Sequence, residues 1–368
     1  MKSSWIRIGV PSLLVLFLAS SLAQAQQMYL MTRLGFSPTS PTINGANGIN
    51  NNGDVVGYDS AINGAYLLHN GVVSSLGMTS ASGVAISITG HVALRSWGPD
   101  LHSYLFTPGR RIWFNPFTDL GTLGGTGGLN NTGQTVALGM NDNRTIVGQS
   151  TVSTTPQTWH AFSWSAGHMT DLGALSPGGT SSANAINNLG QIVGDSFGTD
   201  GIDRAFTMVN GVMTDLDPAT HNYDSTAVAI NDTGQIVVVS NLVWQVVPVG
   251  RFGFKIMAFP GPTYYTQIYS NGVFTNIGSL SYAGDIWGYS INSAGDVVGA
   301  AVDSTINRSH AFLYHAGTMT ALDDVVTNLS GWRVSIATRI NDLGEIACWV
   351  RNNTTNELQA AILTPILD

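Results

Sequence analysis

Short apolar runs along the chain alternate with turns rich in Gly, Asn and Asp. Gln191-Ile192-Val193-Gly194 and Asp296-Val297-Val298-Gly299 are β-branched runs bounded by glycine, and an Asn-x-x-Gly sequence precedes each. β-branched residues favour extended strands, while Asn, Asp and Gly tolerate the positive φ angles of hairpin turns. The pattern therefore predicts short antiparallel strands joined by tight turns.

Three phrases recur in fixed order along the chain. One complete copy contains His160-Ala161-Phe162, then Met169-Thr170-Asp171-Leu172-Gly173, then Ile186-Asn187-Asn188-Leu189-Gly190. The anchors Ile-Asn-x-x-Gly, small-aromatic and Leu-Gly each occur seven times when degenerate copies are counted. One unit predicts four strands in about 45–50 residues, which is the size of a propeller blade.

The two ends of the chain supply complementary parts of one unit. Residues 29–35 match only the fourth strand, whereas residues 340–363 match only the first three. Pairing these parts would complete one blade and close a ring, which hides exposed sheet edges. We therefore predict an all-β fold, a single seven-bladed β-propeller over residues 26–368. Six or eight blades stay open, because the second unit is degenerate and residues 128–133 resemble a partial extra copy.

The phrases His-Ala-Phe, Asp-Leu-Gly and Ile-Asn-x-x-Gly-x-Val-Val-Gly resemble those of the bacterial extracellular repeat proteins named for their HAF motif. The resemblance covers nearly the whole chain after residue 25. It implies export and a repeated β architecture, for a family whose biochemical role is largely undefined. It brings no catalytic residues to this chain.

Residues 1–25 have the layout of a secretory signal peptide. Basic residues precede an apolar stretch from Ile8 to Leu22, and Ala23-Gln24-Ala25 forms a small-x-small cleavage site. The apolar stretch is broken by Pro11 and falls short of the roughly 18 residues that a spanning helix needs. We expect export with cleavage, no transmembrane segment afterwards, and an extracellular or periplasmic protein.

Composition and charge narrow the range of partners. Only 10% of the residues are charged, the formal net charge is −8, and no basic stripe is visible. Nucleic acids and anionic membranes bind clustered Lys and Arg, so neither is expected as a partner. The single Cys348 lies in an apolar run and is predicted to be a buried small hydrophobe. We expect a monomer that binds a polysaccharide or an envelope or extracellular protein.

Standard catalytic motifs such as His-Glu-x-x-His and Gly-x-Ser-x-Gly are absent from the sequence. Three pairs do place a donor on the third strand of a unit and a carboxylate on the fourth. These pairs are His102 with Asp119, His160 with Asp171, and Arg204 with Asp215. A catalytic group is needed once, whereas these pairs repeat from unit to unit, so we interpret them as structural contacts between strands.

Loops that break the repeat are the better indication of function, because binding residues concentrate on loops held by a rigid scaffold. The connections after Val-Val-Gly and after Leu-Gly emerge on one face, here the variable face. The Asn-x-x-Gly and Ala-Gly turns emerge on the other, the constant face. The largest insertion on the variable face spans residues 241–266. Its candidate ligand-binding residues are Trp244, Arg251, Phe252, Phe254, Phe259, Tyr264 and Tyr265.

Two interpretations of this insertion remain open. Its aromatic side chains can stack on sugars or anchor a protein. Alternatively, the insertion forms its own hairpin and tucks those rings into a satellite cluster. We expect a non-enzymatic binding module without a cofactor that uses the variable face.

The alternative function is a secreted carbohydrate-active hydrolase or lyase that uses loop aspartates near the channel mouth. These unmatched acids are Asp100, Asp195, Asp200, Asp203, Asp224, Asp285 and Asp303. Bound Ca²⁺ is only weakly indicated, because no Asp-x-Asp-x-Asp spacing occurs among them. A purely structural envelope component is a third possibility.

Overall fold

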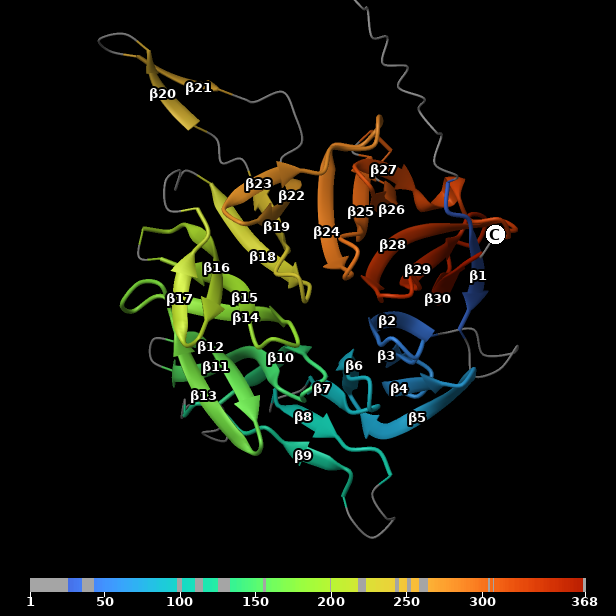
Figure 1. Cartoon of the computed structure of the whole chain (residues 1–368), viewed down its shortest axis with the longest axis horizontal. Helices are drawn as coiled ribbons and strands as arrows, with labels where there is room; N and C mark the ends of the chain where they lie inside the picture. Colours follow the sequence, from blue (N-terminus) through green and yellow to red (C-terminus); the bar gives the residue numbers. More distant parts are fainter. Residues whose placement is uncertain are drawn as a thin grey trace, which may run out of the picture.

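The computed structural model describes most of the chain after residue 25. The described ranges are 26–34, 43–97, 101–109, 115–124, 133–154, 157–198, 200–217, 223–241, 245–249, 253–257, 264–303, 305–306 and 308–366. Within them, the chain forms seven four-stranded antiparallel sheets arranged as the blades of a propeller (Figure 1). The prediction of an all-β propeller with seven blades is confirmed.

Within each of the first six blades, the strand order follows the chain from the centre outwards. Blade 1 contains β2 (Ile43–Ile49), β3 (Val55–Asp59), β4 (Gly64–His69) and β5 (Val72–Thr79). Blade 2 contains β6 (Ala81–Ile86), β7 (Val92–Ser96), β8 (Ser103–Phe106) and β9 (Phe117–Asp119). Blade 3 contains β10 (Thr135–Met140), β11 (Ile146–Thr154), β12 (Gln157–Ser165) and β13 (His168–Gly173). Blade 4 contains β14 (Thr180–Ile186), β15 (Ile192–Phe197), β16 (Asp203–Val209) and β17 (Val212–Asp215). Blade 5 contains β18 (Asp224–Ile230), β19 (Ile236–Asn241), β22 (Tyr264–Ser270) and β23 (Val273–Asn276). Blade 6 contains β24 (Asp285–Ile291), β25 (Val297–Asp303), β26 (Arg308–His315) and β27 (Thr318–Ala321).

Blade 7 joins the two ends of the described chain. It contains β28 (Trp332–Ile340), β29 (Ile346–Asn352) and β30 (Leu358–Pro365), and its fourth strand is β1 (Tyr29–Arg33). β1 pairs antiparallel with β30, with Met31 opposite Leu363. A short 3₁₀ helix, η1 (Leu322–Asp324), links blade 6 to this blade. The predicted closure by one strand from the N-terminal end and three from the C-terminal end is confirmed.

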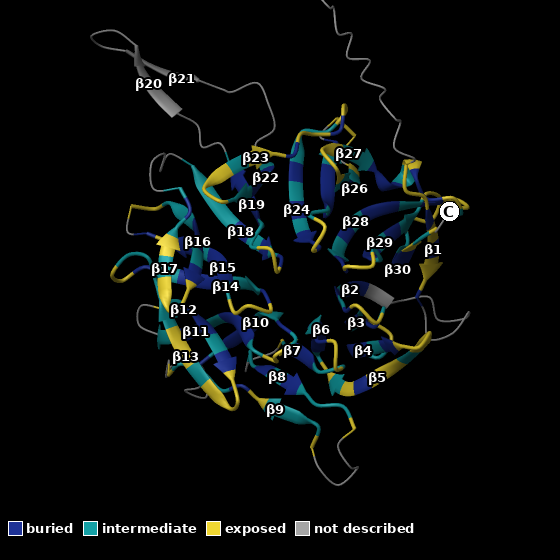
Figure 2. Cartoon of the chain, in the orientation of Figure 1, coloured by how far each residue is buried: buried dark blue, intermediate teal, exposed yellow. Residues whose placement is uncertain are grey.

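The hydrophobic core lies between blades rather than in one central mass. In one cluster, for example, Ala93 and Leu105 of blade 2 pack with Ile146 and Phe162 of blade 3. Figure 2 shows buried residues concentrated in the inner strands and exposed residues along outer strands such as β13 and β17. Cys348 is fully buried and unpaired in the core of blade 7, as the sequence predicts.

The Val-Val-Gly and His-Ala-Phe phrases are coupled by packing inside a blade. Gly148 of β11 lies opposite Phe162 of β12, and Gly194 of β15 lies opposite Phe206 of β16. Both phenylalanines are fully buried. A Cβ atom added at Gly148 would lie 1.9 Å from the carbonyl oxygen of Val136 in the innermost strand. Glycine is therefore needed where the backbone of one strand approaches its neighbour and an aromatic ring fills the space beside it.

The asparagine of the Ile-Asn-x-x-Gly phrase links six of the seven blades to the next blade. Its side-chain amide donates to the backbone carbonyl at the equivalent position of the following blade, as in Asn187 to Asn231 at 3.0 Å. The full set of bonds is Asn50 to Ser87, Asn141 to Asn187, Asn187 to Asn231, Asn231 to Asn292, Asn292 to Asn341, and Asn341 to Asn50. The last bond crosses the junction between blades 7 and 1. The motif therefore holds the ring together in addition to forming a turn.

The degenerate second unit lacks this asparagine, because Ser87 occupies its position. The backbone N–H of Ile88 still donates to Asp142 Oδ1 of blade 3 at 2.7 Å, as the equivalent N–H groups of Asn188 and Ser293 donate to the following blade. The irregular unit is thus still a blade joined to its neighbour. Residues 128–132 of the suspected extra copy lie outside the described ranges.

Candidate binding face

The variable face is formed by the connections between the second and third strands of each blade and by the connections from one blade to the next. The predicted insertion on this face is shorter than the sequence suggests. Asn241 is the last residue of β19, and Tyr264 and Tyr265 belong to β22, with Asn241 opposite Tyr264. The insertion proper therefore spans residues 242–263. It contains a two-stranded hairpin of β20 (Gln245–Val249) and β21 (Gly253–Met257), as one of the two interpretations expected.

The seven candidate residues fall into three groups. Trp244, Arg251, Phe252 and Phe259 lie outside the described residues. Phe254 lies on β21, opposite Pro248. Tyr264 and Tyr265 are on the blade scaffold, where the Tyr264 ring packs against Trp287 of blade 6 with ring centroids 4.0 Å apart. Burial raises the pKa of Tyr265, and hydrogen bonds with Ser240 and Tyr223 act in the opposite direction.

Further aromatic residues of the variable face were missed by the sequence analysis. Trp97, which follows β7, packs edge-on against Tyr58 of blade 1, with ring centroids 5.0 Å apart. Tyr282, between blades 5 and 6, packs in the same way against His310. Trp97 is 39% exposed and Tyr282 is 43% exposed. Trp97 lies between two strands of blade 2 and Tyr282 between two blades, in connections where a repeat pattern gives no signal, and only the three-dimensional arrangement gathers them on one face.

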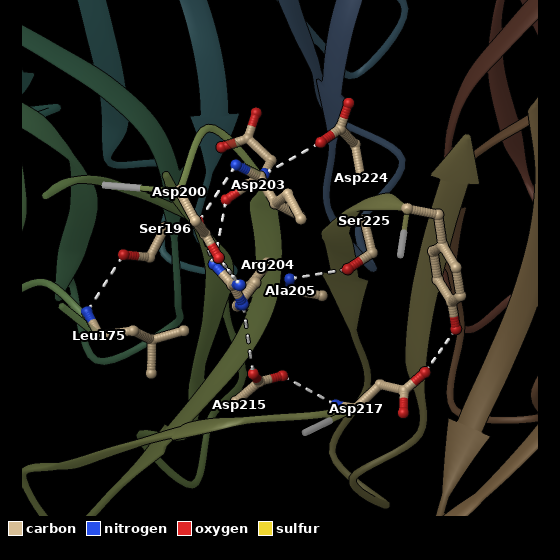
Figure 3. A network of polar contacts seen from close by, with 12 residues as sticks. Leu175, Ser196, Asp200, Asp203, Arg204, Ala205, Asp215, Asp217, Asp224 and Ser225 are labelled. Carbon is tan, nitrogen blue, oxygen red and sulfur yellow. Dashed lines mark hydrogen bonds and ion pairs between the residues drawn. The ribbon is translucent and has the colours of Figure 1, made fainter. Parts of the chain in front are cut away.

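A network of polar contacts lies between blades 4 and 5 on the variable face (Figure 3). Arg204 forms ion pairs with Asp200 and Asp215, the latter at 3.8 Å. The backbone N–H of Asp203 donates to Asp224 Oδ1 at 3.1 Å, and that of Ala205 donates to Ser225 Oγ at 3.0 Å. These contacts join the third strand of blade 4 to the first strand of blade 5, so the network supports the junction between them.

Two aspartates of this region have shifted pKa values of opposite sign. The hydrogen bond from Arg204 lowers the pKa of Asp200 to about 2. Burial raises the pKa of Asp195 to about 6; the hydrogen bond from Asn184 opposes that rise, and the charge of Asp203 adds to it. Asn184 Nδ2 lies 2.7 Å from Asp195 Oδ1. A buried carboxylate near other acids loses hydration and gains repulsion, which explains the raised value.

The predicted pairs between third and fourth strands are all present. His102 Nδ1 lies 2.9 Å from Asp119, and His160 Nδ1 lies 2.9 Å from Asp171. Asp171 also accepts the backbone N–H of Gly173 at 2.8 Å. The aspartate of Asp-Leu-Gly therefore fixes its own turn and holds the histidine of His-Ala-Phe, which supports a structural role for both phrases.

The loop aspartates do not gather at the central channel. The channel and its mouth toward the variable face are lined by none of the described ones. Asp195, Asp203 and Asp224 lie around the junction of blades 4 and 5, whereas Asp285 begins β24 and Asp303 ends β25. Asp100 lies outside the described residues. Within the described ranges, the channel mouth on the variable face thus lacks the pair of loop carboxylates that the hydrolase alternative requires.

No group of three or more His, Cys, Asp or Glu side chains is placed to hold a metal ion in the part of the chain that the structure describes. Across the same residues, no helix has the length and apolar character needed to cross a membrane. The predicted signal peptide, residues 1–25, lies outside the described ranges.

Comparison with known proteins adds no named relative. No family model matches the chain, and no curated protein matches it. Solved structures similar to it include a puromycin-hydrolyzing peptidase of Mycobacterium tuberculosis, at 10% identity and a TM-score of 0.48, covering 87% of this chain and 53% of that one. The chain thus spans about half the length of that protein. Another is an arginine-to-alanine triple mutant of AofleA from Arthrobotrys oligospora, at 10% identity and a TM-score of 0.40, covering 80% of this chain and 90% of that one.

Proposed function

We propose that this protein is an exported binding module that recognises a polysaccharide through the variable face of its propeller. One observation carries the proposal. Among the described residues, all three exposed aromatic side chains, Trp97, Phe197 and Tyr282, lie on the variable face. The exposed large side chains of the constant face are aliphatic, such as Leu189 and Leu343. Aromatic rings on a rigid rim offer flat apolar surfaces on which sugar rings stack.

The repeated motifs support the assignment of ligand binding to the residues that lie outside the repeat. Asn, Gly and the His–Asp pairs account for the turns and strand contacts of the scaffold, so the residues that depart from the repeat are the ones free to specify a ligand. The recurring phrases also support placing the protein with the bacterial extracellular HAF-motif repeat proteins. The sequence of residues 1–25 supports export.

A glycan array followed by titration calorimetry with the best glycan tests the proposal. We expect Trp97→Ala and Tyr282→Ala each to weaken binding by about tenfold, because exposed aromatic anchors contribute more than their share of binding energy. Leu189→Ala and Leu343→Ala, on the constant face, are matched controls and should leave the affinity unchanged. Equal affinity in all four variants, each with wild-type thermal stability, contradicts the proposal.

The hairpin insertion is tested separately. Residues 242–263 can be replaced by a short Gly-containing turn, because Asn241 and Tyr264 are direct partners in the ladder. Loss of all binding in this variant assigns the ligand to the insertion, whereas full retention assigns it to the aromatic rim of the blades. A pull-down that captures an extracellular protein, together with a blank glycan array, contradicts the polysaccharide assignment.

A further inference from the structure

The innermost strands of all seven blades carry the same irregularity. Each has a β-bulge near its middle, where the register with the second strand shifts by one residue. The bulged residues are Asn47, Val84, Leu138, Asn184, Val228, Tyr289 and Thr338. Every one of them lines the central channel or its mouth. A bulge changes the direction in which one side chain points. The seven bulged residues therefore contribute one side chain per blade to the wall of the channel, and these side chains are not all of one type.

The channel has two chemically different ends. Toward the constant face, its opening is lined by Asp142, Asp232 and Asp342. Toward the variable face, a cavity of about 320 Å³ is lined by Arg95, Arg339, Trp349, Tyr289 and mostly apolar neighbours, with no acidic side chain among them. Arg95 lies one residue before the end of β7, which places this cavity on the side of the variable face.

The donors around this cavity have no acidic partner among the described residues. Arg339 Nη1 donates to the backbone carbonyls of Thr338 at 2.8 Å and of Tyr289 at 3.5 Å, and no described carboxylate forms an ion pair with it. The indole Nε1 of Trp349 is buried without a hydrogen-bond partner. A half-buried cation without a counter-charge and a buried N–H without an acceptor each cost free energy. An anionic ligand that contacts both groups would offset this cost.

The protonation states at this end fit an anionic ligand. Burial lowers the pKa of Arg339, but a guanidinium keeps its charge in proteins. Burial raises the pKa of Tyr289, so its phenol stays protonated and can donate a hydrogen bond. Two arginines without an ion-pair partner among the described residues thus line one cavity of a protein whose overall charge is −8.

We propose that the cavity at the variable end of the central channel binds a small organic carboxylate of the size of a uronic acid. Arg339 and Arg95 hold the carboxylate, the Trp349 indole N–H donates to an oxygen of the ligand, and the apolar side chains Val84 and Leu138 contact its ring. The volume is at the lower end for small-molecule sites. The acidic opening at the constant face repels an anion, so the ligand enters from the variable face. The site is separate from the aromatic rim.

Titration calorimetry with D-glucuronate, and with D-glucose as its neutral counterpart, tests the assignment. We expect glucuronate to bind and glucose to bind at least tenfold more weakly. Arg339→Gln and Arg95→Gln should each weaken glucuronate binding by tenfold or more, as expected when a charged hydrogen bond is lost. Arg144→Gln, an exposed arginine in a constant-face turn, is the matched control and should bind as the wild type does.

Three outcomes overturn the assignment. These are equal binding of glucose and glucuronate, unchanged binding in a folded Arg95→Gln variant, and competition by inorganic sulfate as effective as glucuronate itself. Arg95 is exposed, so its variant remains informative if Arg339→Gln fails to fold. Trp97→Ala and Tyr282→Ala should not affect glucuronate binding, which keeps this result distinguishable from failure of the rim proposal.

Discussion

At the scale of single residues, the side chains that recur from unit to unit can be distinguished, as structural residues, from the side chains that do not recur. The asparagine amides form hydrogen bonds between blades, and the histidine–aspartate pairs join strands within a blade. The buried glycines allow neighbouring strands to approach closely. Asp195 differs, because it is a half-buried carboxylate in a second strand whose pKa is raised to about 6 even though Asn184 donates a hydrogen bond to it. A single substitution shows what this burial costs.

Asp195→Asn is expected to stabilise the protein at neutral pH but not at pH 4. Because the pKa of Asp195 is about 6 when folded and near 3.8 when unfolded, the folded state holds its proton more tightly between these values. Stability therefore falls as pH rises through this window. Removing the charge should raise the free energy of unfolding by up to about 3 kcal/mol at pH 7, measured by urea denaturation at several pH values.

Asp200→Asn serves as the control of opposite sign. Its pKa is lowered to about 2 by Arg204, so its stabilising contribution is present at neutral pH and is lost on acidification. Replacing it should lower stability at pH 7 and change little near pH 2. A pH profile of Asp195→Asn that runs parallel to that of the wild type would contradict the assignment.

At the scale of the strand, the motifs are interdependent. Four blades pair a glycine of the second strand with an aromatic residue of the third. These pairs are Gly57 with Tyr66, Gly148 with Phe162, Gly194 with Phe206, and Gly299 with Phe312. In blade 7 the same position is Cys348, and its partner is the small Ala361. In these five blades, an aromatic ring of the third strand therefore occurs where the second strand has a glycine, whereas blade 2 pairs Leu94 with Tyr104.

Gly148→Ala is expected to destabilise the protein by about 1–3 kcal/mol or more, because the added methyl group overlaps the Val136 carbonyl and forces the strands apart. Cys348→Ala is the matched control, since blade 7 already accommodates a side chain there and should lose less stability. Thermal unfolding of both variants measures the difference. The packing explanation is wrong if the two rank in the reverse order.

At the scale of the whole molecule, closure depends on one short strand. β1 supplies the outer edge of blade 7, and the N–H of Tyr29 also donates to Val325 at 2.8 Å. Without β1, the edge of β30 would be exposed, and an unpaired edge invites pairing with another chain.

Deletion of residues 26–34 is expected to lower the melting temperature and to promote self-association, measured by calorimetry and light scattering. Adding a peptide with the sequence of residues 26–35 should restore both properties, whereas a scrambled peptide should not. A truncated protein that stays monomeric with an unchanged melting temperature would show that closure by β1 is dispensable.

The sequence by itself determined the scaffold. The chain contains seven copies of one sequence unit, with turn residues, β-branched strands and complementary ends. These copies suffice to predict the propeller, because each blade is specified by its own residues and by its neighbour. The sequence also predicted the His–Asp contacts, since both partners lie in one unit.

Only the tertiary structure decided which residues share a surface. Trp97 and Tyr282 lie in non-repeating connections that come to one face only when the ring closes. Arg95 and Arg339 are 244 positions apart and line one cavity only because innermost and neighbouring strands from different blades converge on the axis. The bulges recur at one position of the repeat, but the repeat alone does not show that this position faces the channel. Local contacts can be read from a short segment, whereas a site assembled around an axis depends on the closure of the whole chain.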